Sequence, residues 1–168
     1  MELIRLCKAA LVGAVALFFT LVAYGNLTDY DSNWQFVQHV LSMDTTFPDS
    51  SLHWRAITDP DLQQLAYWLI IGAEILTALI LWLGTIRLLA HVSKPSFAGV
   101  KGIAVLGLTL GFLLYSVGFV SVGGEWFAMW QSEIWNGQAK AFQFLAMIGA
   151  VLIILLIPET TDGRPENS

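Results

Sequence analysis

The sequence predicts an all-α integral membrane protein in which four transmembrane helices form a bundle. Hydrophobic residues make up 56% of the 168 residues and charged residues only 12%, a composition too apolar for a soluble domain. Four apolar runs are long enough to cross a hydrocarbon core of about 30 Å as helices. Most charged residues lie between or beyond these runs, so we expect a single membrane domain, residues 1–168.

The predicted spans are approximately residues 9–27, 65–89, 102–122 and 139–157, with loops at 28–64 and 123–138 and a tail at 158–168. Small residues at helical spacing indicate faces on which neighbouring spans can approach closely. They are Gly13 in the first span, Gly107, Gly111 and Gly118 in the third, and Ala146 and Ala150 in the fourth. The polar, proline-containing tail is typical of disordered sequence.

The basic residues predict the orientation of the spans. One side carries Arg5, Lys8, Arg87, Lys94, Lys101 and Arg164, whereas the other side carries only Arg55 and Lys140. The positive-inside rule therefore places both termini and the middle loop in the cytoplasm and the other two loops outside. An alternative is that the first apolar run is a cleaved signal peptide, with Ala23 and Gly25 before the cut. We favour a retained span, because cleavage would remove the charge anchor of the first loop.

Glu74 lies near the middle of the second predicted span, where a charged carboxylate costs at least about 2.5 kcal/mol. We expect this carboxyl to be protonated, hydrogen-bonded or turned toward other helices. Tyr67 and Thr77 lie on the same helix face as Glu74. Thr20 and Tyr115 lie at a similar depth in antiparallel spans, so we expect both to hydrogen-bond with Glu74. This polar cluster can carry a proton or an ion, or it can be a packing contact between helices.

The first outer loop is too long to be a simple connection, so we expect it to contain folded structure. Apolar residues recur at helical spacing between Trp34 and Ser42, with polar residues opposite. This pattern predicts an interfacial helix that lies on the membrane. Later in the loop, Thr58 or Asp59 can cap a helix that has Pro60 in its first turn, so the second span's helix is expected to begin outside the bilayer.

The second outer loop is predicted to be a tryptophan-rich hairpin. Together with the first loop it presents a set of residues that we call the outer face: Trp34, Trp54, Glu125, Trp126, Trp130, Glu133 and Trp135. Aromatic anchors beside polar groups are typical of protein interfaces, so the outer face is a candidate surface for a protein partner. An aromatic belt at the level of the lipid headgroups is the alternative explanation for the tryptophans.

Two long segments carry a family resemblance. Residues 26–47 (NLTDYDSNWQFVQHVLSMDTTF) and 123–138 (GGEWFAMWQSEIWNGQ) resemble the bacterial family of predicted small integral membrane proteins of unknown function, and the resemblance covers nearly the whole chain. It implies four spans with two elaborated outer loops and a location in the bacterial inner (plasma) membrane. It brings no catalytic residues.

Several kinds of site are disfavoured by the sequence. Cys7 is the only cysteine, which excludes an internal disulfide and a multi-cysteine metal site. His39, His53, Asp44 and Glu125 lie in the outer loops, but no pair has the spacing that places two metal ligands on one helix face. No span contains histidine, which argues against a haem between the helices, whereas quinone contact through aromatic residues stays open. We expect no metal and no other cofactor, and no basic patch suggests nucleic acid.

Two hypotheses for the function follow. The first is a non-catalytic protein whose outer face binds a protein partner in the inner membrane or periplasm, as an accessory subunit or as an immunity-type guard against a membrane-acting toxin. The second is a small transporter or a proton- or ion-handling protein centred on Glu74. No motif typical of hydrolysis or phosphoryl transfer is present, which argues against an enzyme. The small-residue faces would also allow a homo-oligomer.

Overall fold

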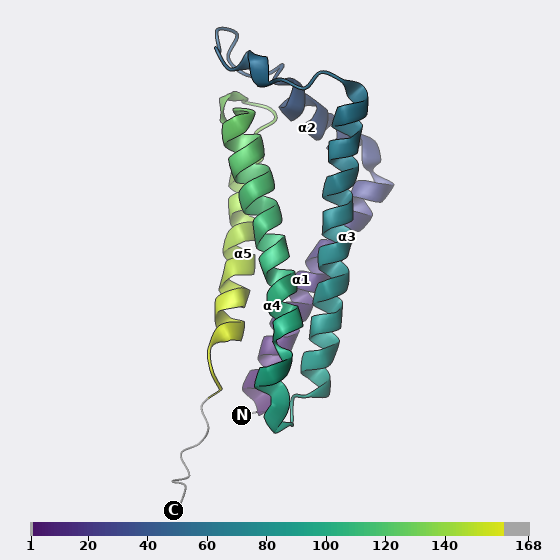
Figure 1. The fold of residues 1–168 in the computed structure, drawn as a ribbon, viewed down its shortest axis with the longest axis vertical. Coiled ribbons are helices and arrows are strands. Elements are labelled where there is room, and N and C mark those ends of the chain that lie inside the picture. Colours follow the sequence, from purple (N-terminus) through teal and green to yellow (C-terminus); the bar gives the residue numbers. More distant parts are fainter. Residues whose placement is uncertain (1, 160–168) are drawn as a thin grey trace, which may run out of the picture.

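Four long helices run side by side in the computed structural model, which describes residues 2–159 (Figure 1). They are α1 (Glu2–Thr28), α3 (Pro60–Ala90), α4 (Gly102–Leu113) with its continuation η3 (Leu114–Trp126), and α5 (Gln138–Leu156). Each is long and apolar enough to cross a membrane. No strand occurs in residues 2–159, so the prediction of an all-α membrane fold with four spans is confirmed.

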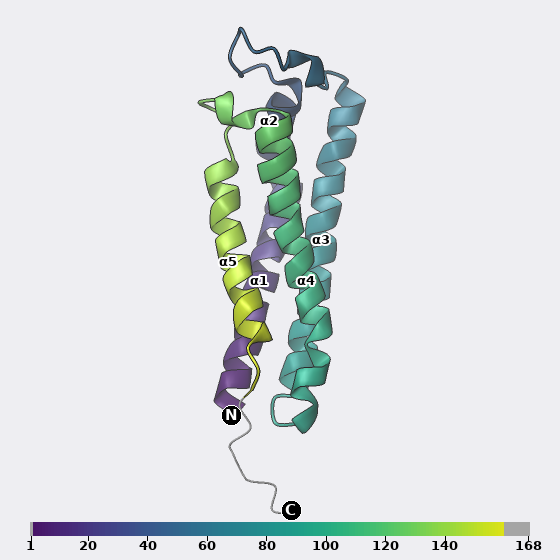
Figure 2. The same ribbon diagram turned by 60° about the vertical axis from the view of Figure 1, so that its left-hand side comes forward.

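Four shorter helices lie in the connections: α2 (Tyr30–Ser42), η1 (His53–Arg55), η2 (Pro95–Val100) and η4 (Met129–Gln131). The first and last described residues and the α3–α4 connection lie at one end of the bundle, which we call the terminal end (Figures 1 and 2). We call the opposite end, where α2 and loops 43–59 and 127–137 lie, the α2 end. A helix is therefore present where the sequence predicted one in the first loop, and it begins four residues earlier than Trp34.

Helix α3 is central to the packing because α1 and α4 both pack against it. Its buried residues recur every three or four positions, among them Tyr67, Ile71 and Leu81, while the apolar residues between them are exposed, as suits a lipid-facing surface. The helix begins with a side-chain cap: the Asp59 carboxylate accepts from the backbone N–H groups of Asp61 and Leu62 at 2.9 and 3.4 Å. Of the two residues predicted to cap this helix, Thr58 and Asp59, Asp59 is therefore the cap.

Glycines mark the closest approaches between the helices. A Cβ added at Gly107 would lie 2.8 Å from the Leu81 side chain, and one at Gly111 would lie 2.7 Å from Phe19. At Gly13 the nearest side-chain atom would be Thr85 Cγ2, at 3.2 Å. These three glycines of the predicted packing set therefore lie at helix contacts, where a larger residue would have to displace a side chain of the neighbouring helix.

The other three residues of the predicted packing set do not lie at such contacts. Ala146 and Ala150 are exposed, because the buried face of α5 runs through residues such as Leu145 and Ile148 instead. Gly118 is also exposed, and the nearest atom to a Cβ there would be Cδ1 of Leu114 in the same helix, at 3.9 Å. The close-packing role predicted for these three residues is therefore wrong.

The reason for the error at Gly118 is that η3 is a π-helix. The backbone N–H of Phe127, at its end, donates to the Val122 carbonyl at 3.0 Å, five residues earlier, as in a π-helix. The wider turns shift the side-chain positions that an α-helical spacing predicts. Gly118 therefore leaves the face on which Gly107 and Gly111 lie.

Candidate functional site

Glu74 of α3 is buried against the last turn of α1. Its side chain is 2% exposed, and its Oε2 accepts a hydrogen bond from Asn26 Nδ2 at 2.6 Å. The backbone carbonyl of Asn26 also accepts a hydrogen bond from the Tyr67 hydroxyl at 3.2 Å. Asn26 thus connects two buried polar side chains of α3 to the end of α1.

Thr20 does not take part in this cluster, so its predicted hydrogen bond with Glu74 is wrong. It lies on the exposed face of α1, where its hydroxyl donates to the Ala16 carbonyl at 2.8 Å and accepts from Trp82 Nε1 at 3.0 Å. The buried face of α1 passes through Phe19 and Asn26 instead. The hydrogen bond from Asn26 places Glu74 beside the last turn of α1, about two turns beyond Thr20.

Tyr115 and Thr77 are both buried, at different places relative to Glu74. Tyr115 lines the same cavity as Glu74, but its hydroxyl forms no hydrogen bond within residues 2–159, so the predicted bond to Glu74 is not made. Thr77 lies farther along α3, against Gly111 of α4. The structure therefore brings Glu74, Tyr67 and Tyr115 together and separates them from Thr20 and Thr77.

A cavity of about 140 Å³ adjoins the carboxyl group, and we call it the Glu74 cavity. Its polar lining consists of Glu74, Asn26, Asn33, Tyr67 and Tyr115, and aromatic and aliphatic residues complete the wall. Asn33 of α2 is exposed, so the cavity has a polar rim on that side. A volume of this size with several polar groups can hold water or the polar part of a ligand.

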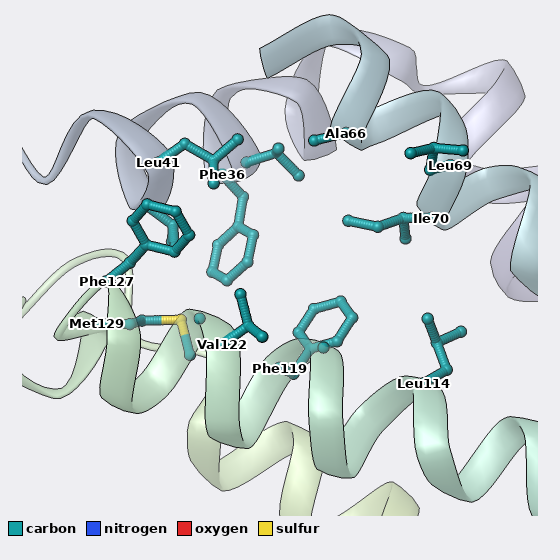
Figure 3. A pocket seen from close by; sticks show the side chains of 14 residues that line it. Phe36, Leu41, Ala66, Leu69, Ile70, Leu114, Phe119, Val122, Phe127 and Met129 are labelled. Carbon is teal, nitrogen blue, oxygen red and sulfur yellow. The ribbon is translucent and has the colours of Figure 1, made fainter. Parts of the chain in front are cut away.

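A second cavity of about 250 Å³ lies under α2, between α3 and η3, and we call it the apolar cavity. Figure 3 shows Phe36 and Leu41 of α2 opposite Phe119 and Val122 of η3, with Ile70 of α3 at the side. Every residue that lines it is apolar. The cavity exists because α3 packs closely against α4 but hardly touches η3.

The outer face divides into exposed and packed residues. Trp54, Trp126 and Trp130 are 71%, 47% and 49% exposed. Trp34 is half-buried and packs near Tyr67, with ring centroids 6.1 Å apart.

Trp135 is also half-buried, and its ring stacks on that of His39 at 4.7 Å. Glu125 and Glu133 are exposed. The seven residues therefore do not form one continuous surface: five are available to a partner, and Trp34 and Trp135 stabilise the α2 end.

Arg55 fixes two of the exposed tryptophans in place. Its guanidinium lies 5.3 Å from the Trp54 ring centroid and 4.7 Å from the Trp126 ring centroid, within the range of cation–π interactions. It also donates to the Trp126 carbonyl at 3.1 Å, and the two indole rings meet edge to face at 5.8 Å. These aromatic side chains are thus held in a defined arrangement although they are exposed.

The histidines considered as metal ligands have other partners. His39 Nδ1 lies 2.7 Å from Asp44 Oδ2, and His53 Nε2 lies 2.9 Å from the Thr46 hydroxyl. Within residues 2–159, no group of three or more histidine, cysteine, aspartate or glutamate side chains is arranged to hold a metal ion.

A charged cluster ties the terminal end together. Glu159 Oε1 lies 2.8 Å from both Lys8 Nζ of α1 and Lys101 Nζ beside α4, and Lys8 also donates to the Ile157 carbonyl. Burial by itself would raise the pKa of Glu159, but hydrogen bonds from Lys101 and Lys8 and their positive charges hold that pKa below its ordinary value. The prediction that the whole tail lacks packed structure is therefore wrong at Glu159, and residues 160–168 lie outside the described part of the chain.

The sequence analysis did not predict the role of Asn26 or the partners of Glu159. Only the role of Asn26 could have been predicted from a pattern in the sequence. Asn26 continues the spacing of buried residues in α1, which runs through Ala16, Phe19 and Ala23, so the pattern could have placed it on the inner face. The cluster at Glu159 joins residues from opposite ends of the chain, and no local pattern indicates such a contact.

The fold and its buried polar site define an integral membrane protein with four apolar helices, a helical cap at one end and a glutamate inside the bundle. A family model described as "Predicted small integral membrane protein (DUF2165)" matches residues 4–158, and the chain belongs to this family. The resemblance inferred from the two loop segments is thereby confirmed. No curated protein and no solved structure matches the chain.

Proposed function

We propose that this protein is a non-catalytic component of the bacterial inner membrane that binds a protein partner at its α2 end, as an accessory subunit or an immunity-type guard. In this proposal both termini are cytoplasmic and α2 lies at the outer membrane interface. The binding surface consists of the exposed residues of the outer face, which are Trp54, Glu125, Trp126, Trp130 and Glu133.

The observation that carries the proposal is the group of large, exposed and ordered aromatic side chains at the α2 end. Trp54 and Trp126 are held by Arg55, and Trp130 meets Phe47 edge to face with ring centroids 5.9 Å apart. Aromatic side chains dominate the binding energy of many interfaces, and side chains that are already ordered lose less entropy on binding. A partner could therefore gain affinity here without much rearrangement of this protein.

The surroundings of the tryptophans suggest the chemistry of the partner. Glu125 and Glu133 are exposed beside them, whereas the nearby Arg55 is engaged by the two indole rings. A surface depression of about 260 Å³ between loops 45–48 and 131–134 lies next to Trp130. A segment with lysine or arginine beside apolar side chains would match this surface in both charge and shape.

The experiment that tests this role compares copurification from native membranes. A tagged chain and its Trp126→Ala/Trp130→Ala variant are solubilised in mild detergent, and proteins present in stoichiometric amounts are identified by mass spectrometry. We expect a partner that the double variant loses. The matched control is Trp68→Ala, which removes an equally exposed tryptophan from the side of α3 and should retain the partner. Recovery of the wild-type chain alone, or equal recovery of the partner with both variants, would contradict the proposal.

The second candidate function, proton or ion handling at Glu74, rests on a different observation. Glu74 Oε1 accepts no hydrogen bond from residues 2–159, although Oε2 is bonded to Asn26, and the residue lines a cavity. Glu74→Gln should then abolish proton or ion flux in proteoliposomes while the protein is still produced in normal amounts. Unchanged flux, or loss of protein without a specific loss of flux, would exclude this role.

A further inference from the structure

The Glu74 cavity and the apolar cavity are neighbours and share part of their walls. Phe36 and Val37 of α2, Ile70 of α3 and Phe119 of η3 line both of them. One side of this shared wall is apolar throughout, and the other side carries the buried carboxyl. The two neighbouring cavities therefore differ in character: the one between α3 and η3 is apolar, and the other carries Glu74.

The polar cavity contains groups that lack partners within the protein. The Tyr115 hydroxyl forms no hydrogen bond within residues 2–159 although the residue is buried, and Glu74 Oε1 accepts none there. Both residues line the Glu74 cavity, so the two oxygens are available to a molecule that enters it. A polar group of a ligand in this cavity would find free hydrogen-bonding positions on Glu74 and Tyr115.

The apolar cavity has its opening on the side surface of the bundle, near the α2 end. Leu69 and Val122 line it and are 65% and 42% exposed, and Gly118 beside them is also exposed. In a membrane this surface faces lipid, so an apolar molecule dissolved in the bilayer can reach the cavity directly. Because the lining is apolar throughout, the cavity favours a hydrocarbon body.

The charges of the lining residues determine which polar head group of a ligand the Glu74 cavity favours. Glu74 is the acidic residue of the lining, and none of the described residues that line either cavity carries a positive charge. An anionic headgroup would therefore lie beside a carboxyl without a counter-charge. A positively charged nitrogen can donate hydrogen bonds to Glu74, and the cavity is also lined by Tyr115 and Phe119, whose aromatic rings attract cations.

We propose that the two cavities form one binding site for a lipophilic amine, with the hydrocarbon chain in the apolar cavity and the nitrogen at Glu74. The inference goes beyond the proposed partner binding, because it uses a different part of the molecule and needs no second protein. A cavity of about 150 Å³ holds a benzene molecule, so the larger apolar cavity suits a chain of about eight to ten carbons.

The test is equilibrium binding of radiolabelled decylamine to the full chain in nanodiscs of zwitterionic lipid, with empty nanodiscs as the background. We expect saturable binding of one decylamine per chain. Decanol and decanoate have the same chain but a neutral and an anionic head, and both should bind about tenfold or more weakly, since hydrogen bonds to charged groups contribute about 1.5–3 kcal/mol. Equal binding of all three, or no saturable binding, would overturn the proposal.

Two variants locate the site. Glu74→Gln should weaken decylamine binding about tenfold or more, so that the preference for decylamine over decanol is lost. Gly118→Leu fills the mouth of the apolar cavity and should weaken the binding of all three probes, and space is available for it because a Cβ there is 3.9 Å from its nearest neighbour. Gly72→Leu is the matched control, since a Cβ at Gly72 meets nothing within 4 Å and the residue lines neither cavity. If decylamine binds equally well to both glycine variants, the site lies elsewhere and the proposal fails.

Discussion

At the scale of single residues, Asn26 and Glu74 hold the end of α1 against α3. Asn26→Leu removes the hydrogen bond to Glu74 Oε2 and leaves a buried carboxyl unpaired. We expect this variant to lose about 1–3 kcal/mol of stability, measured by thermal unfolding in detergent. Replacing both residues, Asn26→Leu with Glu74→Leu, should restore much of the loss, because the carboxyl that lost its partner is then removed as well.

The control for Asn26 is Thr28→Val. Thr28 is exposed and its hydroxyl donates only to the Tyr24 carbonyl of its own helix, so this variant should unfold close to the wild-type temperature. A double variant that is no more stable than Asn26→Leu alone would show that the hydrogen bond is not what stabilises this contact.

Glu159 gives a prediction about pH. Its pKa in the folded protein lies below the ordinary value of 4.5, so its stabilising contribution is complete above that pH and is lost as the pH falls below it. Glu159→Gln should therefore unfold at a lower temperature than the wild type at pH 7, and the two curves should converge below about pH 4.5. A temperature difference that stays constant down to pH 3.5 would rule out an ionic role for this carboxylate.

At the scale of helices, Gly84 sets the distance between α3 and α4. A Cβ added there would lie 2.8 Å from the Ala104 backbone, which cannot move aside as a flexible side chain can. Gly84→Ala should therefore cost about 1–3 kcal/mol of stability through overpacking. Gly72→Ala on the exposed side of the same helix should be neutral or slightly stabilising, because alanine favours helix over glycine by up to about 1 kcal/mol. Equal unfolding temperatures for the two variants would contradict this account.

The sequence predicted which residues form helices better than it predicted which residues of different helices are in contact. The four apolar runs, the cap at Asp59 and the helix of the first loop all depend on neighbouring residues, so local patterns predicted them. The partner of Glu74 depends on where α1 ends and how it is rotated, which no pattern within α3 contains. The position of Gly118 depends on a change from α-helical to π-helical turns, and hydrophobic spacing does not signal that change.

At the scale of the whole molecule, the orientation in the membrane can be tested by cysteine labelling. Cys7 is exposed at the terminal end, and Ser51 is exposed in the loop at the α2 end. The proposed orientation predicts that, in intact bacterial cells that produce the protein, a maleimide that does not cross the inner membrane labels Ser51→Cys in a Cys7→Ser background but does not label Cys7. Cys7 should react only after the membrane is permeabilised. The reverse pattern would show that the α2 end faces the cytoplasm and would remove the basis for an external partner.

The contact of Glu159 with Lys8 and Lys101 also affects how the protein is made. The ribosome synthesises Glu159 after all four spans, whereas Lys8 precedes them and Lys101 lies between the second and third. During translation the two lysines are therefore present before the carboxylate that binds them. The ion pairs of Glu159 with Lys8 and Lys101 can form only after the C-terminal segment has left the ribosome. A chain that ends before Glu159 would therefore have both lysines but not the ion pairs that connect α1, the start of α4 and the C-terminal segment.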